Sequence, residues 1–164
     1  MKEIKIEDLK MNPFTLIGKD WCLIGAKSND KFNAMTASWG SVGVLWNKNI
    51  VTIYIRPQRY TREFIEAQDY FTLSFFESEY KKALGVYGSK SGRDINKEKE
   101  TGLTRVDDGS YAYLKEAKLV IECKKMYCGK LHPEEMLDSE IENHYPEKDY
   151  HYIYVGEITK ILEK

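Results

Sequence analysis

The chain has 164 residues, of which 42% are hydrophobic, and this is enough for one domain with a hydrophobic core. Its 25 lysines and arginines are balanced by 26 acidic residues, giving a formal charge of -1. That balance excludes a global electrostatic attraction to nucleic acid or to an anionic membrane. We therefore expect a single domain over residues 1–164, in which any anion-binding site is local.

The amino terminus and the cysteines indicate the cellular compartment in which we expect the protein. The first 18 residues are charged throughout and lack the apolar core of a signal peptide, and no later run reaches membrane-spanning length. Cys22, Cys123 and Cys128 are odd in number and follow no paired metal spacing. In a strand, Cys123 and Cys128 would point to opposite faces. We expect a cytoplasmic protein with buried, inert thiols and no metal.

The first strand patterns are the apolar run at residues 21–26 and the run NAMTASWG at residues 33–40. The second run has an unusually small face, formed by Ala34, Thr36, Ser38 and Gly40. Such a face leaves the backbone approachable for a flat aromatic ligand. It is equally typical of close packing by another backbone element. Periodicity alone leaves both interpretations open.

The run IVTIYI at residues 50–55 is largely apolar on both faces, which predicts a strand buried on both sides, as in a barrel wall. RPQRYT follows and leads into a predicted helix that starts at Tyr60. Arg56 and Arg59 lie at this strand-to-helix turn, where guanidinium groups and free helix N–H groups suit a phosphate. A solvated surface cluster is the alternative interpretation.

A second basic corner follows a predicted strand at 71–76 and a candidate helix at 78–88. In SKSGRD, Ser91 and Asp94 have the spacing of a capping box, which predicts a helix that starts there and ends at Gly102. Lys97 would lie one turn into that helix. Two basic corners in a near-neutral chain predict one shared anion.

The carboxy-terminal part has a strand pattern at 118–123, a polar loop with a short helix at 132–149, and a long closing strand at 151–162. Several strands with helices inserted between them favour a barrel in which helices plug the spaces between strands. The predicted fold class is mainly β with α.

Five motifs occur in an order that resembles the flavin reductase-like family, which includes the flavoredoxins, over residues 11–161. They are NAMTASW, IVTIYI running into RPQRYT, DYFTLSFF, SGRD and HYIYVGEI. The resemblance implies an FMN-binding split β-barrel with Greek-key-like connections. It also implies a homodimer with the flavin at or near the subunit interface.

The same resemblance implies which residues bind the cofactor. The wall along the flavin ring would be Asn33, Ala34, Met35, Thr36, Ala37, Ser38 and Trp39. The phosphate would be held by Arg56, Gln58, Arg59 and Thr61, and the loop closing over it would contain Ser89, Lys90, Ser91 and Arg93. On this hypothesis, a bulky side chain in place of Ser38 or Ala34 should expel FMN and leave the fold intact.

Many family members that use NAD(P)H carry glycine, aspartate and histidine before the closing strand, where this chain has Asp149, Tyr150 and His151. His151 is therefore the candidate catalytic residue on the electron-donor side, the alternative being a structural histidine. The implied function is an FMN oxidoreductase that passes electrons from NADH or NADPH to a flavin, a metal complex or a small acceptor. The alternative is a flavoredoxin-type carrier that acts with redox-protein partners and has no nicotinamide site.

Overall fold

The computed structural model describes all residues, Met1–Lys164. Its strands are β1 (Lys2–Ile4), β2 (Cys22–Ser28), β3 (Lys31–Ala37), β4 (Gly40–Leu45), β5 (Lys48–Ile55), β6 (Tyr70–Phe75), β7 (Arg105–Asp108), β8 (Tyr111–Leu114), β9 (Leu119–Lys130) and β10 (Tyr152–Glu163). The α-helices are α1 (Pro13–Gly18), α2 (Tyr60–Glu66), α3 (Lys81–Ser89) and α4 (Lys97–Thr101). The short 3-10 helices are η1 (Ile6–Asp8), η2 (Ser78–Tyr80), η3 (Pro133–Glu135) and η4 (Ser139–His144).

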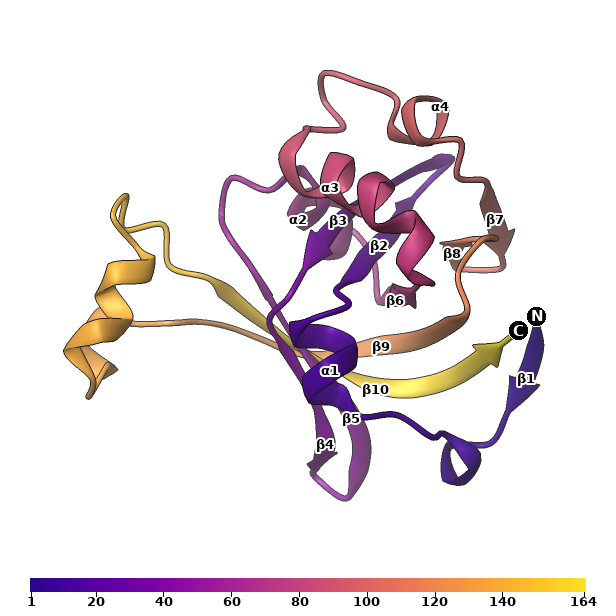
Figure 1. The fold of residues 1–164 in the computed structure, drawn as a ribbon. Coiled ribbons are helices and arrows are strands. Elements are labelled where there is room, and N and C mark those ends of the chain that lie inside the picture. The colour runs from indigo at the N-terminus through magenta and orange to yellow at the C-terminus, as the bar shows by residue number, and fades with distance from the viewer.

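One antiparallel sheet dominates the fold, with strand order β3-β2-β6-β9-β10-β5-β4 and with β1 added beside β10. The sheet curves around its core, and β3 and β4 end the order without pairing with each other (Figure 1). A curved sheet that stays open is the arrangement of a split barrel, so the prediction of a mainly β fold with inserted helices is confirmed. Strands β7 and β8 form a separate hairpin.

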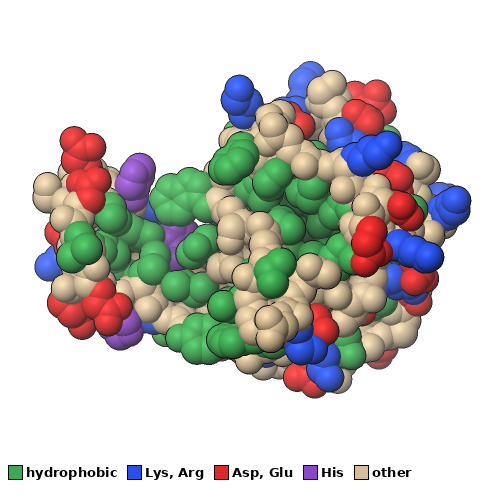
Figure 2. Space-filling view, turned by 90° about the horizontal axis from the view of Figure 1, so that it is seen from below, with side chains coloured by type: hydrophobic (Ala, Val, Ile, Leu, Met, Phe, Trp, Pro, Cys, Tyr) green, Lys and Arg blue, Asp and Glu red, His purple; other side chains and the backbone are tan.

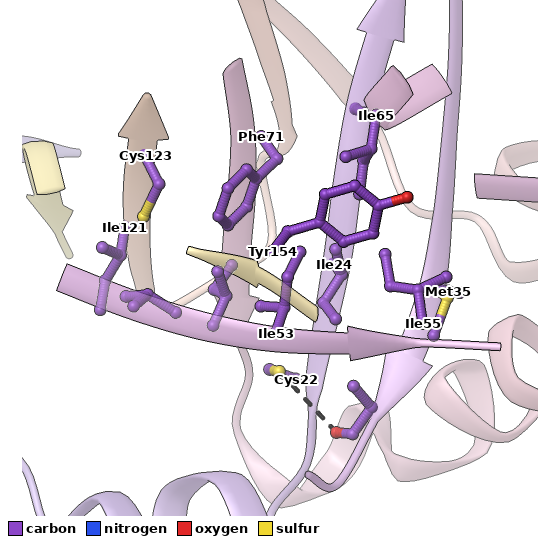
Figure 3. Close-up of a cluster of buried hydrophobic side chains, with 14 of the residues drawn as sticks. Cys22, Ile24, Met35, Ile53, Ile55, Ile65, Phe71, Ile121, Cys123 and Tyr154 are labelled. Atoms are coloured by element: carbon purple, nitrogen blue, oxygen red, sulfur yellow. Dashed lines mark hydrogen bonds between the residues drawn. The ribbon is translucent and has the colours of Figure 1, made fainter. Parts of the chain in front are cut away.

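Two hydrophobic clusters hold the sheet. The larger lies inside the curve, where Ile53, Phe71 and Tyr154 converge from three strands and Ile65 of α2 covers them (Figure 3). The smaller lies beneath α3, which contributes Leu84 and Tyr87. Because helix α3 packs on β3, the outer face of that strand is covered over part of its length.

Residues 131–150, which connect β9 to β10, form a projecting arm that contains η3 and η4 (left in Figure 1). The prediction of a polar loop with short helical structure is confirmed here, although both helices are of the 3-10 type. The arm returns to the sheet at His151, immediately before β10 begins.

Two element predictions are wrong in detail. The strand expected at 33–40 ends at Ala37, and the chain turns before β4 begins at Gly40. The capping box at Ser91 does not start a helix, because the Ser91 hydroxyl accepts from the Arg93 N–H (3.2 Å) and closes a turn instead. Helix α4 begins six residues later under an Asn96 cap. Its expected end at Gly102 is confirmed by the left-handed φ of 73°.

The cysteines differ in environment. Cys22 and Cys123 are buried, and burial raises the pKa of the Cys22 thiol to about 12. Cys128 is exposed, so the prediction that it is a buried thiol is wrong. The outer part of β9, where Cys128 lies, runs toward the arm and beyond the main core. No helix combines the length and the apolar composition needed to cross a membrane.

Candidate cofactor-binding site

A pocket of about 190 Å³ lies where β3 ends, β5 leads into α2 and the arm returns to β10. Three segments that the sequence singled out meet here: the end of the small-faced strand, the first basic corner and the histidine before the closing strand. The lining residues are Met35, Thr36, Ala37, Ser38, Trp39, Tyr54, Arg56, Arg59 and His151. Figure 2 shows hydrophobic side chains across the face seen from below, from the arm to the main body.

The small face of β3 has two neighbours. At Ala34 it is buried in the core beneath α3, and the Thr36 hydroxyl donates to the Leu84 carbonyl of that helix (2.5 Å). A Cβ on Gly88 would lie 3.4 Å from the Thr36 Cβ, so the helix packs closely on the strand. Beyond Thr36 the chain faces the pocket through Ser38. The close-packing interpretation of the small face is therefore confirmed at Ala34 and Thr36, and the ligand-wall interpretation stays a prediction for the end at Ser38.

Arg59 and Lys97 bring two cations to the carboxy-terminal end of α3. Arg59 donates to the Gly88 and Tyr87 carbonyls (2.7 and 3.2 Å). The Lys97 ammonium is buried and donates to the carbonyls of Ala34 (2.8 Å) and Tyr87 (3.3 Å). Burial lowers the pKa of both groups, and the nearby Arg59 charge helps to bring that of Lys97 to about 8.

The side-chain partners of both cations are backbone carbonyls, and neither forms an ion pair with a carboxylate. Arg59 lines the pocket, and the buried Lys97 lies near Arg59 outside the lining. Two positive charges with only carbonyl oxygens as partners leave a net positive potential on this side of the pocket. An anionic group in the pocket would be stabilised by that potential. This arrangement fits the phosphate of a nucleotide cofactor and distinguishes the end of α3 from a solvated basic patch.

Arg56, unlike Arg59 and Lys97, is paired with a carboxylate. Its guanidinium donates to both carboxylate oxygens of Asp149 at 2.5 Å and to the His144 carbonyl at 2.8 Å. The Gln58 amide also donates to Asp149 (2.6 Å). Burial acts against ionisation of Asp149, but these donors together lower the pKa of its carboxyl group. Arg56 and Gln58 thus anchor the arm to the body, and the charge of Arg56 is already compensated.

His151 lines the pocket and is buried. Its Nδ1 lies 2.8 Å from the Tyr145 hydroxyl, and its ring centre lies 5.1 Å from that of Trp39. Burial first, and the Arg56 charge second, lower the pKa of His151 to about 4, while Asp149 acts in the opposite direction. The imidazole is therefore uncharged at neutral pH.

Several residues expected at the cofactor do not line the pocket. Thr61 is buried and its hydroxyl accepts from the Asn33 amide (2.8 Å), which ties β3 to α2. In the second basic corner, Arg93 pairs with Glu63 and lies 4.4 Å above the Tyr60 ring. The others outside the pocket lining are Asn33, Ala34, Gln58, Ser89, Lys90 and Ser91. The Ser89 hydroxyl donates to the Gly85 carbonyl of its own helix (2.8 Å).

Two aromatic residues were missed from the sequence: Tyr54, which lines the pocket, and Tyr145, which contacts the lining residue His151. Tyr54 precedes Arg56 by two residues in an extended strand, so both side chains lie on one face, and this period of two could have identified it. Tyr145 belongs to the polar arm, where nothing in the sequence marked it as a partner of His151.

The sequence model of the flavin reductase like domain matches residues 16–164, and the chain therefore belongs to this family. Membership supports an FMN-related redox function. A comparison with curated proteins gives no significant match.

Solved structures show the same fold at low sequence identity. A flavoredoxin of Desulfovibrio vulgaris (Miyazaki F) is 21% identical with a TM-score of 0.68, covering 88% of this chain and 69% of that one. An FMN-binding domain of a flavin reductase-like enzyme from Shewanella baltica is 17% identical with a TM-score of 0.70, and the match covers 98% of this chain and 75% of that one. An FMN-binding protein from Thermus thermophilus is 16% identical with a TM-score of 0.72, covering 100% and 82%. These likenesses establish a fold of the flavin reductase-like, FMN-binding type.

Proposed function

We propose that the chain binds FMN in this pocket and is an oxidoreductase that passes electrons from NADH or NADPH to a flavin, a metal complex or a small acceptor. The observation that carries the proposal is the pair of cations at the end of α3, Arg59 and Lys97, which lack carboxylate partners. Arg59 lines the pocket, which also has small side chains in its wall, and the buried Lys97 lies near enough to Arg59 for the two charges to interact. The chain is of the flavin reductase like family.

The residues present fit the cofactor in two respects. The phosphate would be held by Arg59 with support from the Lys97 charge, whereas Arg56 is committed to Asp149. The flat ring would lie along Thr36, Ala37 and Ser38, where short side chains leave the backbone accessible. Bound FMN supplies hydride and single-electron chemistry, and the protein positions it and excludes water.

The experiment that tests this proposal measures flavin content and flavin reduction. Protein purified without added flavin should be yellow or should bind FMN tightly in a fluorescence titration. Rapid mixing with NADH or NADPH in the absence of oxygen should then bleach the flavin absorbance. A colourless protein with no affinity for FMN would refute the proposal.

A flavoredoxin-type electron carrier is the second candidate. The observation that favours it is the stretch before β10, where Asp149 is engaged by Arg56 and the Tyr150 ring packs 4.9 Å from that of Tyr145. These residues occupy the positions at which nicotinamide-using members carry glycine and aspartate. FMN that stays oxidised with both nicotinamide nucleotides, but is reduced by a low-potential redox protein, would support the carrier.

We also propose that the chain is a homodimer in the cytoplasm, with no nucleic acid or membrane as a partner. β4 is an edge strand whose end carries Val44, Leu45 and Trp46 at the surface, and the Trp46 ring lies 6.3 Å from that of Tyr127 on β9. Exposed apolar residues gathered on an edge strand are typical of a subunit interface. The free state of all three cysteines suits a reducing compartment.

A further inference from the structure

The hydrogen bond between Tyr145 and His151 determines which ring nitrogen of the histidine carries the proton. It is buried, it joins the arm to the residue before β10, and it is the one hydrogen bond made by the Tyr145 hydroxyl. A phenol is a good donor, and a neutral imidazole nitrogen is a good acceptor.

If Tyr145 donates to Nδ1, both groups are satisfied and the imidazole proton lies on Nε2. If Nδ1 donates instead, the phenol hydrogen has no acceptor in a buried position, which is unfavourable. The geometry therefore favours the Nε2-protonated form.

The remaining ring nitrogen, Nε2, has no hydrogen-bond partner in the protein. The buried polar side-chain atoms without partners belong to Arg62 and Tyr87, so Nε2 of His151 is not sealed in the interior. Because His151 lines the pocket, this nitrogen is open to a ligand there.

We propose that Tyr145 is a positioning residue that holds His151 in its Nε2-protonated form, and that this Nε2–H donates a hydrogen bond to the flavin ring in the pocket. The hydrogen bond from His151 to the flavin rests on the proposed function. The control of the His151 tautomer by Tyr145 concerns the protein alone and can be tested without flavin.

The surroundings keep the imidazole neutral, as the inference requires. The charged and titratable groups around it are Arg56, which follows β5, Tyr54 of β5, Asp149 and Tyr145 of the arm and, across the Trp39 ring, His144. The Arg56 charge opposes a second positive charge on the ring, and Asp149 is held in bonds to Arg56 and Gln58.

The first experiment is long-range 1H–15N NMR on the flavin-free protein, which distinguishes protonated from unprotonated imidazole nitrogens. The chain has only three histidines, so the His151 signals can be assigned by their loss in His151→Gln. At pH 7, wild-type His151 should be neutral with its proton on Nε2. Tyr145→Phe should populate the Nδ1-protonated form as well. A proton on Nδ1 in the wild-type protein would overturn the inference.

The second experiment measures FMN affinity in matched variants. A glutamine amide reproduces the Nε2 donor, and an asparagine amide reproduces the position of Nδ1. His151→Asn should therefore bind FMN about 5-fold more weakly than the wild type, the value of one hydrogen bond. His151→Gln should recover most of that loss, and equal affinities of the two variants would overturn the donor role.

A double-mutant cycle separates positioning from a general effect on packing. Tyr145→Phe should weaken FMN binding in the wild-type background but have no further effect in His151→Gln, which has no tautomer to hold. Equal losses in both backgrounds would show that Tyr145 acts through packing and would overturn its assigned role. Absence of FMN binding by the wild type would refute both the proposed function and the hydrogen bond from His151 to the flavin. The NMR result would still decide whether Tyr145 controls the His151 tautomer.

Discussion

Arg56 and Arg59 stand three residues apart in one turn and differ in what compensates their charge. Arg56 meets the Asp149 carboxylate, which is 93 residues away in the sequence, whereas Arg59 meets only backbone carbonyls. From the sequence the two arginines are equivalent candidates for a phosphate. The distinction depends on a tertiary contact that no local pattern contains.

Replacing Arg59 with alanine should weaken FMN binding about tenfold or more, because a hydrogen bond to a charged group is worth about 1.5–3 kcal/mol. Arg62→Ala is the matched control, since Arg62 lies in α2, three residues after Arg59, but pairs with Glu66 and does not line the pocket. Fluorescence titration with FMN measures both. Unchanged affinity in Arg59→Ala would refute the placement of the phosphate.

FMN affinity should fall as the pH rises from 7 to 9. The pKa of Lys97 is lowered to about 8 in the flavin-free protein, and a bound phosphate would raise it. Above pH 8, binding must therefore be accompanied by proton uptake, which costs affinity up to about tenfold per pH unit. In Lys97→Met this fall should disappear and binding at pH 7 should weaken. An identical pH profile in variant and wild type would exclude Lys97 from the site.

Stability should depend on pH through His151. Its pKa is about 4 in the folded protein and about 6.5 when unfolded. Between these values the unfolded chain binds a proton that the folded chain does not, so the free energy of unfolding decreases as the pH falls from 6.5 to 4. The loss should be on the order of 2 kcal/mol after allowance for solvent screening.

Urea denaturation at pH 7 and pH 4.5 measures this loss of unfolding free energy. His151→Gln is the control, because its carboxylates titrate as in the wild type and only the contribution of His151 is removed. A wild type and variant that lose the same stability would show that His151 does not contribute.

At the scale of elements, α3 and β3 together explain why the strand has one small face. Ala34 is 1% exposed in the core beneath α3, whereas Ser38 is exposed and lines the pocket. The burial of Ala34 argues against the expectation that bulk at this residue leaves the fold intact, because the position is part of the core.

Ala34→Leu and Ser38→Leu should accordingly separate stability from binding. Overpacking at Ala34 should cost about 1–3 kcal/mol of unfolding free energy. Ser38→Leu should change stability by less than about 0.5 kcal/mol and should reduce FMN affinity by narrowing the pocket. Thermal melts and FMN titrations of both variants check this, and a wild-type melting temperature for Ala34→Leu would contradict the packing on α3.

Elements with strong periodicity could be predicted, and short ones could not. The runs at 50–55 and 71–76 correspond closely to β5 and β6. The four-residue strands β7 and β8 were missed, although Gly109, with a φ of 60°, follows an aspartate in the connecting turn and is a hairpin signal. β4 was missed because its glycines interrupt alternation and its outer residues face solvent.

For the whole molecule, the strand patterns predicted a barrel with inserted helices, and the order of motifs, through the family resemblance, specified a split barrel. The order of motifs could not indicate that the arm folds back so that Asp149 reaches Arg56 and Gln58 and Tyr145 reaches His151. The arm therefore contacts two pocket residues, Arg56 and His151, from segments that are distant from Arg56 in the chain, and these contacts carry no local signature.

The exposed apolar patch on β4 and β9 supports a last prediction about assembly. Val44 is 72% exposed, Trp46 55% and Tyr127 49%, and a monomer would leave this surface in water. Light scattering should give twice the mass of one chain for the wild type and the mass of one chain for the Val44→Glu/Trp46→Glu double variant, because buried unpaired carboxylates oppose association.

Ser78→Glu adds a negative charge at an exposed position outside the patch and should remain dimeric. If the flavin lies near the interface, the monomeric variant should also bind FMN more weakly while its melting in the absence of flavin shows a folded protein. A wild type with the mass of one chain would refute the dimer. A double variant that stays dimeric would place the interface elsewhere on the molecule.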